Sequence, residues 1–301
     1  MKRAGPPLES VASTVQKLAV LLGAGVPPVA AWRYLGEPGR EVTAAIEGGL
    51  SIPSAIRSRA GPGASPAGRA WAGVAAAWQV ASDAGAPIAS TLREFARSLR
   101  AIAAIERDIE TALAGPRATA RLVMVLPGLG IVFGVILGLN PLAVLIGTPA
   151  GAACLVAGVG LMAGAWWWNR RLVAAARPRD LTPGLRCDLM AIAVAGGTSL
   201  DRASAAVDRA LGENGFDPSL GRDDVDEVLA LSRAAGVPAA ELLRSQAEQS
   251  RIGAAAEAER RASVLAVRLM LPLGVCVLPA FMLLGVVPLL ISVISSTVVG
   301  F

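Results

Sequence analysis

The most constraining feature of the sequence is a run of 47 residues without a charged side chain, from Leu122 to Trp168. As a single α-helix, such a run would be about 70 Å long, more than twice the roughly 30 Å hydrocarbon core of a bilayer. The run must therefore fold back once, and Asn140-Pro141 supplies the turn, because proline does not continue a helix. We expect two membrane spans, Leu122–Leu139 and Leu142–Trp168, joined by a turn near 139–141.

A second uncharged run, from Leu269 to Phe301, predicts a third span near Leu269–Ile294. Arginines beside the spans set the orientation, since basic residues are retained on the cytoplasmic side. The Asn140 turn and the C-terminal tail have none, whereas the charged segments next to the spans have twelve: Arg107, Arg117, Arg121, Arg170, Arg171, Arg177, Arg179, Arg186, Arg251, Arg260, Arg261 and Arg268. We therefore expect a multi-pass membrane protein with a cytoplasmic N-terminus and a C-terminus outside the cytoplasm.

The composition excludes several classes of enzyme. The chain has no histidine, so it cannot build a Ser-His-Asp triad, a Cys-His dyad or a histidine zinc site. Its three cysteines, Cys154, Cys187 and Cys276, form no CxxC pair. Lys2 and Lys17 are the only lysines, and no G-x-x-x-x-G-K-[ST] loop is present. We expect no catalytic residue, no cofactor and no metal site, and any motor that drives the protein must act in trans.

The charged segments are predicted to be helical, because Ala, Leu, Arg and Glu dominate and apolar residues recur every three or four positions. They also contain an internal repeat. SDAGAPIASTLREFA at 82–96 matches RAAGVPAAELLRSQA at 233–247, and LLGAGVPPVAA at 21–31 resembles AVAGGTSLDRA at 193–203. We predict an all-α membrane protein in four parts: a cytoplasmic bundle at 1–121, a membrane hairpin at 122–168, a second bundle at 169–268, and a last membrane helix at 269–301.

The repeated AGxP unit predicts a tight turn between two antiparallel helices. Gly85 and Gly236 would end one helix in the left-handed region, and Pro87 and Pro238 would begin the next at its first position. In the GG-x-S version, Thr198 and Asp201 would form a capping box instead. These residues are turn formers first, but the hairpins are also candidate partner surfaces: Gly25, Gly85, Pro87, Arg93, Gly236, Pro238 and Arg244.

Small residues at four-residue spacing in the apolar runs predict close helix packing, within the chain or between chains. The candidates are Gly130, Gly134, Gly138, Gly147, Gly151, Gly160 and Gly164. Prolines in or beside the same runs are expected to kink or loosen their helices: Pro127, Pro149, Pro272, Pro279 and Pro288. The indoles of Trp166, Trp167 and Trp168 are expected at the cytoplasmic interface.

The acidic residues Asp217, Asp223, Asp224, Asp226 and Glu227 are the best apparent metal cluster. Their spacing lacks the pattern of a calcium loop, so we interpret them as a solvated helix start, where acids complement the helix dipole. Residues 1–121 carry the whole net charge of +5, whereas 169–268 is neutral. Aromatic residues are few and no reading motif is present, so we expect no nucleic-acid binding.

Two helical bundles introduced by AG-x-P or GG-x-S turns, each entering a span through R-L-…-L-P (Arg121–Pro127 and Arg268–Pro272), resemble the type II secretion F-domain family. The three-span form with Ala- and Gly-rich spans is most similar to the Tad (Flp pilus) branch, the TadB/TadC-like, GspF-domain membrane proteins. The resemblance extends from about Val15 to Ile294. A metal site on acidic turns elsewhere in the family does not carry over, because this chain has Ser82-Asp83-Ala84-Gly85 there.

The resemblance implies a non-enzymatic inner-membrane platform that couples a cytoplasmic ATPase to the extraction and assembly of pilin. Its implied partners are the motor ATPase, pilin subunits, the lipid bilayer, and a paralogous platform protein or a second copy. The alternative is a subunit of an oligomeric transporter or channel. The uncharged runs weaken this alternative, because ion transport usually requires polar groups at membrane depth.

Overall fold

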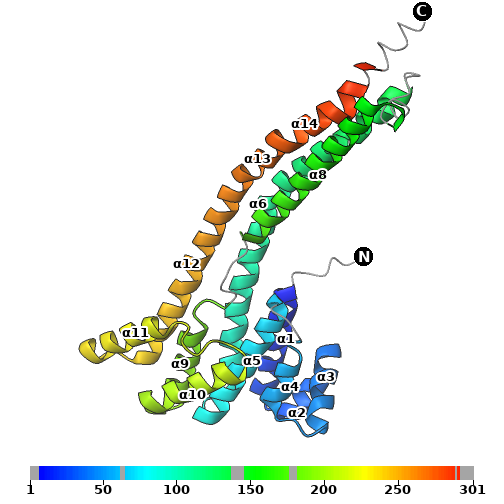
Figure 1. Cartoon of the computed structure of the whole chain (residues 1–301). Helices are drawn as coiled ribbons and strands as arrows, with labels where there is room; N and C mark the ends of the chain where they lie inside the picture. Colours follow the sequence, from blue (N-terminus) through cyan, green and yellow to red (C-terminus); the bar gives the residue numbers. More distant parts are fainter. Residues whose placement is uncertain (1–6, 62–64, 137–145, 176–181, 289, 292–301) are drawn as a thin grey trace, which may run out of the picture. The chain divides into compact units, whose positions relative to one another are not determined.

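The computed structural model describes residues 7–61, 65–136, 146–175, 182–288 and 290–291 (Figure 1). Throughout these ranges the chain forms helices and turns, and no strand occurs in them, so the all-α prediction is confirmed there. The chain divides into two compact units: Met1–Arg107 with Arg179–Glu257, and Asp108–Pro178 with Ala258–Phe301. Two long helices, α6 and α12, contribute residues to both units.

The first unit is built of short helices around α5. Its helices are α1 (Pro7–Gly23), α2 (Pro28–Arg33), α3 (Glu37–Glu47), α4 (Ile52–Ser58), α5 (Pro66–Ala84), the beginning of α6 (Ile88–Ile136), α9 (Leu185–Ala195), α10 (Leu200–Glu213), α11 (Arg222–Ala235) and most of α12 (Ala239–Arg268). Pro66 is the first residue of α5, and the Ser65 hydroxyl accepts a hydrogen bond from the Gly68 amide at 3.0 Å. The sequence therefore fixes where the central helix begins.

Helix α5 is buried along most of its length, and α1, α4, α9 and α10 pack against it. Its many alanines and glycines allow this close approach: a β-carbon on Gly73 would lie 2.9 Å from Cζ of Phe95. The largest buried side chains come from both halves of the sequence, for example Trp32, Leu189 and Leu243. The segments predicted as two bundles, 1–121 and 169–268, thus contribute helices to one shared core.

In the second unit the C-terminal segment packs against α8 (Pro149–Ala175). This segment follows α12 as α13 (Met270–Pro272), a π-helix η1 (Leu273–Val277), α14 (Leu278–Phe281) and a second π-helix η2 (Met282–Val286). By length and composition, two helical stretches among the described residues are apolar enough to cross a membrane, Pro149–Leu172 and Ala239–Val286. The predicted first span lies in α6 as far as Ile136, and its turn at 139–141 lies outside the described residues, so this span and the total of three spans stay predictions.

The buried positions of the C-terminal segment continue along one side of the helix through the two π-helices. Buried positions recur at Leu265, Leu269, Pro272, Val277, Ala280, Leu284 and Pro288. The one five-residue step, from Pro272 to Val277, coincides with η1. Each π-helix ends two residues before a proline, Pro279 or Pro288, whose ring would clash with the carbonyl four residues earlier in a regular helix. The predicted loosening is confirmed at these two prolines, whereas Pro149 begins α8 and Pro127 lies within uninterrupted α6.

Candidate functional site: the helical hairpins and their ion pairs

The two AGxP turns have the same backbone conformation. Gly85 caps the C-terminus of α5 with φ of 69°, and Gly236 caps α11 with φ of 68°. An L-residue rarely adopts this region, so glycine is the residue that the turn requires. Gly25 has a φ of 84° in the corresponding turn between α1 and α2. The predicted left-handed glycine turns are confirmed, while a role of these hairpins in partner binding stays a prediction.

The starts of the following helices differ from the expectation. Pro87 and Pro238 each precede the first helical residue, and their carbonyls accept from the amides of Thr91 (3.1 Å) and Glu241 (3.2 Å). They therefore stand at the cap position and not at the first helical position. The predicted capping box at Thr198 is wrong: its hydroxyl donates to the carbonyl of Ala193 at 2.6 Å, because the preceding turn brings that carbonyl within reach.

An ion pair joins the two matching helices of the repeat. Arg244 Nε on α12 lies 2.8 Å from Glu94 Oε1 on α6, with both side chains partly exposed. Arg93, the counterpart of Arg244, lies near the end of α1, where a β-carbon on Gly23 would come within 3.2 Å of Nη2. In the described part of the chain, no acidic side chain lies within ion-pair distance of Arg93. The two predicted arginines thus have different surroundings.

Asp188 on α9 is a buried carboxylate that the sequence analysis did not single out. It accepts from Arg251 Nη1 on α12 at 2.9 Å and from the Ser98 hydroxyl on α6 at 3.4 Å, so it links three helices. Burial raises the pKa of Asp188 to about 6, although Arg251 opposes this shift and Glu94 adds to it. No local pattern could have identified the residue, because its partners are 63 and 90 positions away.

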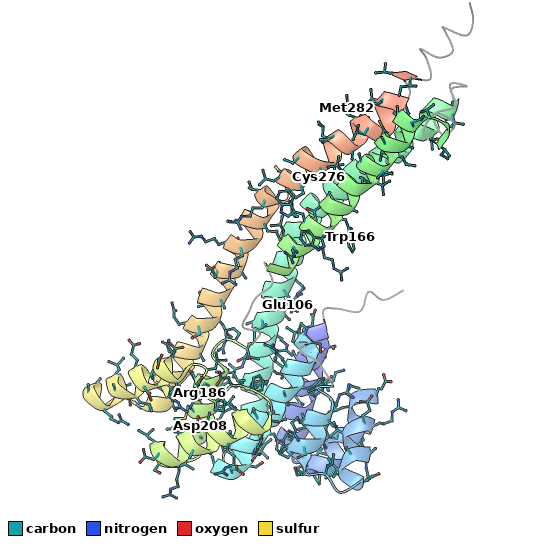
Figure 2. The ribbon with its side chains drawn as sticks, in the orientation of Figure 1. Glu106, Trp166, Arg186, Asp208, Cys276 and Met282 are labelled. Carbon is teal, nitrogen blue, oxygen red and sulfur yellow. The ribbon has the colours of Figure 1, made fainter. Side chains whose placement is uncertain are left out.

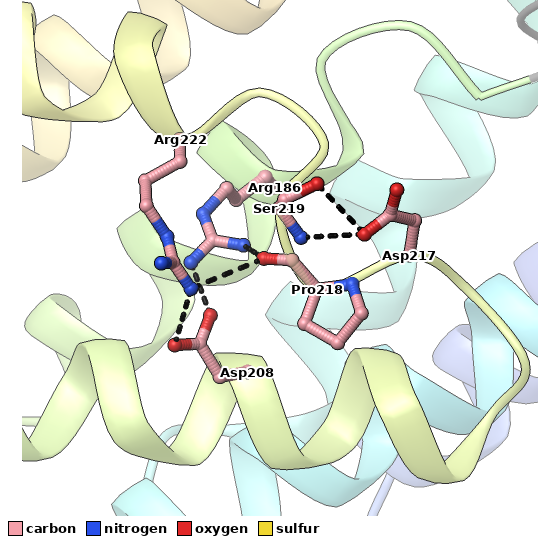
Figure 3. Close-up of polar contacts among 6 residues, drawn as sticks. All are labelled: Arg186, Asp208, Asp217, Pro218, Ser219 and Arg222. Carbon is pink, nitrogen blue, oxygen red and sulfur yellow. Dashed lines mark hydrogen bonds and ion pairs between the residues drawn. The ribbon is translucent and has the colours of Figure 1, made fainter.

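A second cluster fixes the loop between α10 and α11 (Figure 3). The Asp208 carboxylate pairs with the buried Arg186 guanidinium and, at 3.0 Å, with Arg222. Both guanidiniums also donate to the carbonyl of Pro218, Arg222 at 3.4 Å. Figure 2 labels Arg186 and Asp208 among the helices of the first unit, and Figure 3 shows their side chains directed toward one another. The cluster carries no reactive group, and its contacts are those of a structural support.

A cavity of about 220 Å³ lies beside this cluster, lined among others by Thr182, Arg186, Cys187, Phe216 and Asp224. Burial raises the pKa of the Cys187 thiol to about 12, and the nearby carboxylates add to the shift. The thiol is therefore neutral at physiological pH and is a weak nucleophile. The Nε of Arg186 is buried without a hydrogen-bond partner, and its terminal nitrogens are already occupied by Asp208 and Pro218.

Four of the five acidic residues lie at a helix start, as expected, and Asp217 lies in the turn before it. Asp223, Asp224, Asp226 and Glu227 are exposed in the first turns of α11. Asp217 accepts from the amide and the hydroxyl of Ser219, both at 2.8 Å, and these bonds lower its pKa. In the described residues, no group of three or more His, Cys, Asp or Glu side chains is arranged to hold a metal ion.

The predicted packing glycines have different surroundings in the second unit. Gly147, Gly160 and Gly164 have open space around them, while Gly151 is buried near the start of α8. The contact is made instead by Gly158, where a β-carbon would lie 2.5 Å from Cγ of Leu284 on η2. Gly130 and Gly134 lie in α6, but their surroundings are not described, and Gly138 lies outside the described residues. Open space around Gly160 and Gly164 in a single chain leaves room for contact between chains, so their packing role stays a prediction.

The end of α8 combines aromatic and basic side chains. The guanidinium of Arg170 lies 5.2 Å from the ring centre of Trp166, and that of Arg171 lies 4.2 Å from Trp167. The three consecutive tryptophans are all exposed in the chain by itself, and Figure 2 shows the Trp166 side chain on α8. Such indole–guanidinium pairs are typical of helix ends at a membrane–water interface.

Comparison with known proteins places this architecture in context. Residues 14–136 match the family model described as Type II secretion system (T2SS), protein F. The match begins within α1, includes α2 to α5 and the Gly85 turn, and ends with the last residue of α6. No curated protein matches the chain.

The match supports the T2SS protein F family, whose members are non-enzymatic membrane platform proteins that work with secretion ATPases and pilins. Together with the two apolar helices, the match supports an inner-membrane location for the chain.

Proposed function

We propose that the chain is the inner-membrane platform of a Tad (Flp) pilus machine and couples a cytoplasmic motor ATPase to the extraction and assembly of pilin. The observation that carries the proposal is the protein F match over residues 14–136. Those residues include α5, α4 and most of α1, which pack together, and the apolar end of α6. The sequence offers no histidine and no nucleotide-binding loop, so the energy must come from another protein.

The helical repeat supports a mechanical role. Helices α6 and α12 both begin at a glycine hairpin in the first unit and continue into residues of the second unit. The Arg244–Glu94 pair and the Asp188–Arg251–Ser98 contacts link these two helices within the first unit. A motor that binds the hairpins and tilts one of the two helices would therefore move the other. Motion would then pass along the helices toward the pilin in the membrane.

The proposed topology has three spans, with residues 1–121 and 169–268 in the cytoplasm and the C-terminus outside. A membrane-impermeant maleimide tests it on cells that express full-length chains with one cysteine each, after replacement of Cys154, Cys187 and Cys276 by serine. We expect labelling of intact cells at Asn140→Cys and Thr297→Cys, and labelling at Ser90→Cys only after permeabilisation. Labelling of Ser90→Cys in intact cells would contradict the topology.

The coupling is tested in a deletion strain that expresses the full-length, affinity-tagged chain. We expect the tagged chain to restore surface pilin and to co-purify from solubilised membranes with the secretion ATPase of the same gene cluster. Ala205, an exposed residue on α10, provides a matched control: Ala205→Ser should leave both readouts unchanged. Normal piliation in the deletion strain would refute the proposal. Restored uptake or efflux of an ion, without any effect on pili, would favour a transporter.

A further inference from the structure

Three exposed arginines form one face at the beginning of α6. Arg93, Arg97 and Arg100 follow each other at four and three residues, so they point from the same side of the helix. In the described part of the chain, none of the three forms an ion pair. We call these residues the arginine stripe. It spans about 10 Å along the helix axis.

The repeat shows how unusual this lack of neutralisation is. Continuing the alignment of 82–96 with 233–247 places Arg93 opposite Arg244 and Arg100 opposite Arg251. Both arginines of the second repeat are paired, Arg244 with Glu94 at 2.8 Å and Arg251 with Asp188 at 2.9 Å. The same fold position therefore carries neutralised arginines in one repeat and unneutralised arginines in the other.

The two acids that would neutralise the arginines of the first repeat are missing from the matching positions. The position that matches Glu94 is Ser245 in the second repeat, which cannot pair with Arg93 in return. Extending the alignment of 21–31 with 193–203 toward the N-terminus places Gln16 opposite Asp188. The middle position is reversed as well, since Arg97 matches Glu248. Three changes at separate positions thus leave a concentrated positive charge on α6.

The chain presents a complementary surface on the same unit. The exposed Asp223, Asp224, Asp226 and Glu227 at the start of α11 form no ion pair within the described residues. These four residues, here called the acidic turn, span about 6 Å along their helix. Among the described residues, no ion pair joins the acidic turn to the arginine stripe inside one chain, although both lie in the first unit. Each surface is therefore available to a second molecule.

We propose that the arginine stripe is a docking surface for the acidic turn of a second copy of this chain. The two surfaces are opposite in charge, the acidic turn is short enough to lie within the length of the stripe, and guanidiniums form directed hydrogen bonds with carboxylates. A helix that binds a membrane surface needs aromatic or large apolar side chains beside its basic face, and few accompany the stripe. The contact is heterologous, with a different surface from each copy, so it joins copies head to tail or closes a ring. It concerns association alone and does not depend on the proposed function.

Charge reversal in the full-length chain tests this contact. One variant carries Arg93→Glu, Arg97→Glu and Arg100→Glu, and a second carries Asp223→Arg, Asp224→Arg and Asp226→Arg. The control reverses three exposed arginines elsewhere in the first unit, Arg40→Glu, Arg202→Glu and Arg233→Glu. Association of donor- and acceptor-labelled copies is measured by energy transfer in detergent micelles at low and high salt. Circular dichroism of each variant verifies that the helices remain folded.

We expect each test variant to associate at least about tenfold more weakly than the native chain, and the control to behave like the native chain. An equimolar mixture of the two test variants should recover association, because each reversed surface then meets an opposite charge. Recovery should weaken as salt increases, since screening acts on exposed pairs. Unchanged association in both test variants, or failure of the mixture to recover, would overturn the proposal. So would unchanged self-association with a loss of binding to the secretion ATPase or to anionic vesicles, because the stripe would then serve that partner.

Discussion

Gly158 and Gly160 lie two residues apart on α8 and should respond differently to the same substitution. Replacing a glycine within a helix by alanine stabilises the helix by about 1 kcal/mol, because the unfolded chain loses freedom. At Gly160 the added methyl group meets open space, so this gain should remain. At Gly158 the methyl group would lie 2.5 Å, 2.8 Å and 3.0 Å from three side-chain carbons of Leu284.

Carbon atoms pack at about 3.5–4.0 Å, so the Gly158→Ala overlap requires a shift of Leu284 or of the helices. Overpacking of this kind costs about 1–3 kcal/mol. The helix-propensity gain is the same at both glycines and cancels in the comparison. We therefore expect the free energy of unfolding of Gly158→Ala to lie about 1–3 kcal/mol below that of Gly160→Ala.

The assay is equilibrium unfolding of the full-length chain in mixed micelles, followed by far-ultraviolet circular dichroism. A double variant, Gly158→Ala with Leu284→Ala, separates the steric contact from other effects, since it removes the atoms that overlap. The cost of Gly158→Ala should be smaller in the Leu284→Ala background than in the native one. Equal stability of the two single alanine variants would refute the packing of η2 against Gly158.

Three further predictions concern the first unit. Gly85→Val should cost at least about 1 kcal/mol and lower surface pilin at matched membrane abundance, because a β-branched residue is strained at positive φ. The control Glu241→Ala should leave surface pilin unchanged. Normal piliation of the valine variant would refute this. Because the pKa of Asp188 is raised, the native state holds a proton between pH 3.8 and about 6 that the unfolded state has released. The free energy of unfolding should therefore fall by up to about 3 kcal/mol as pH rises through this range. Unfolding of Asp188→Asn, measured as a function of pH, should lack this component. Asp208→Ala leaves the buried Arg186 without its carboxylate and should lower the free energy of unfolding by about 3 kcal/mol, measured by thermal or urea unfolding. Asp201→Ala, at an exposed position, should change it little. Similar stability of both variants would contradict the role of the pair.

Local chemistry explains why the sequence predicts the helical hairpins well. Whether a helix can end at Gly85 or Gly236 depends on the backbone freedom of one residue and on the proline that follows. The spacing of apolar residues likewise predicts helices, because burial of one face requires that period. Both properties are contained within a few neighbouring residues, so no knowledge of tertiary contacts is needed.

The remaining features depend on contacts between distant parts of the chain. Asp188 looks like any helical acid in sequence, and it becomes a buried link only when α6 and α12 reach it. Gly158 and Gly160 are equivalent in composition and spacing, and the position of Leu284 on another helix decides which of them is a contact. The shared core of the first unit is hidden for the same reason, since a repeat in sequence does not reveal whether its copies pack separately or together.

The π-helices at Leu273–Val277 and Met282–Val286 have a consequence for sequence change in this segment. A π turn accommodates one residue more than an α turn over the same stretch of axis, so each of them absorbs a single insertion. Deletion of one residue within η1, combined with replacement of Pro279, would turn it into regular helix without shortening the helix axis. Insertion of one residue into a regular helix, with no π turn to absorb it, would rotate every later side chain by about 100° and move Ala280 and Leu284 away from α8. Homologues that gain or lose one residue here should therefore also gain or lose the proline two positions after the turn.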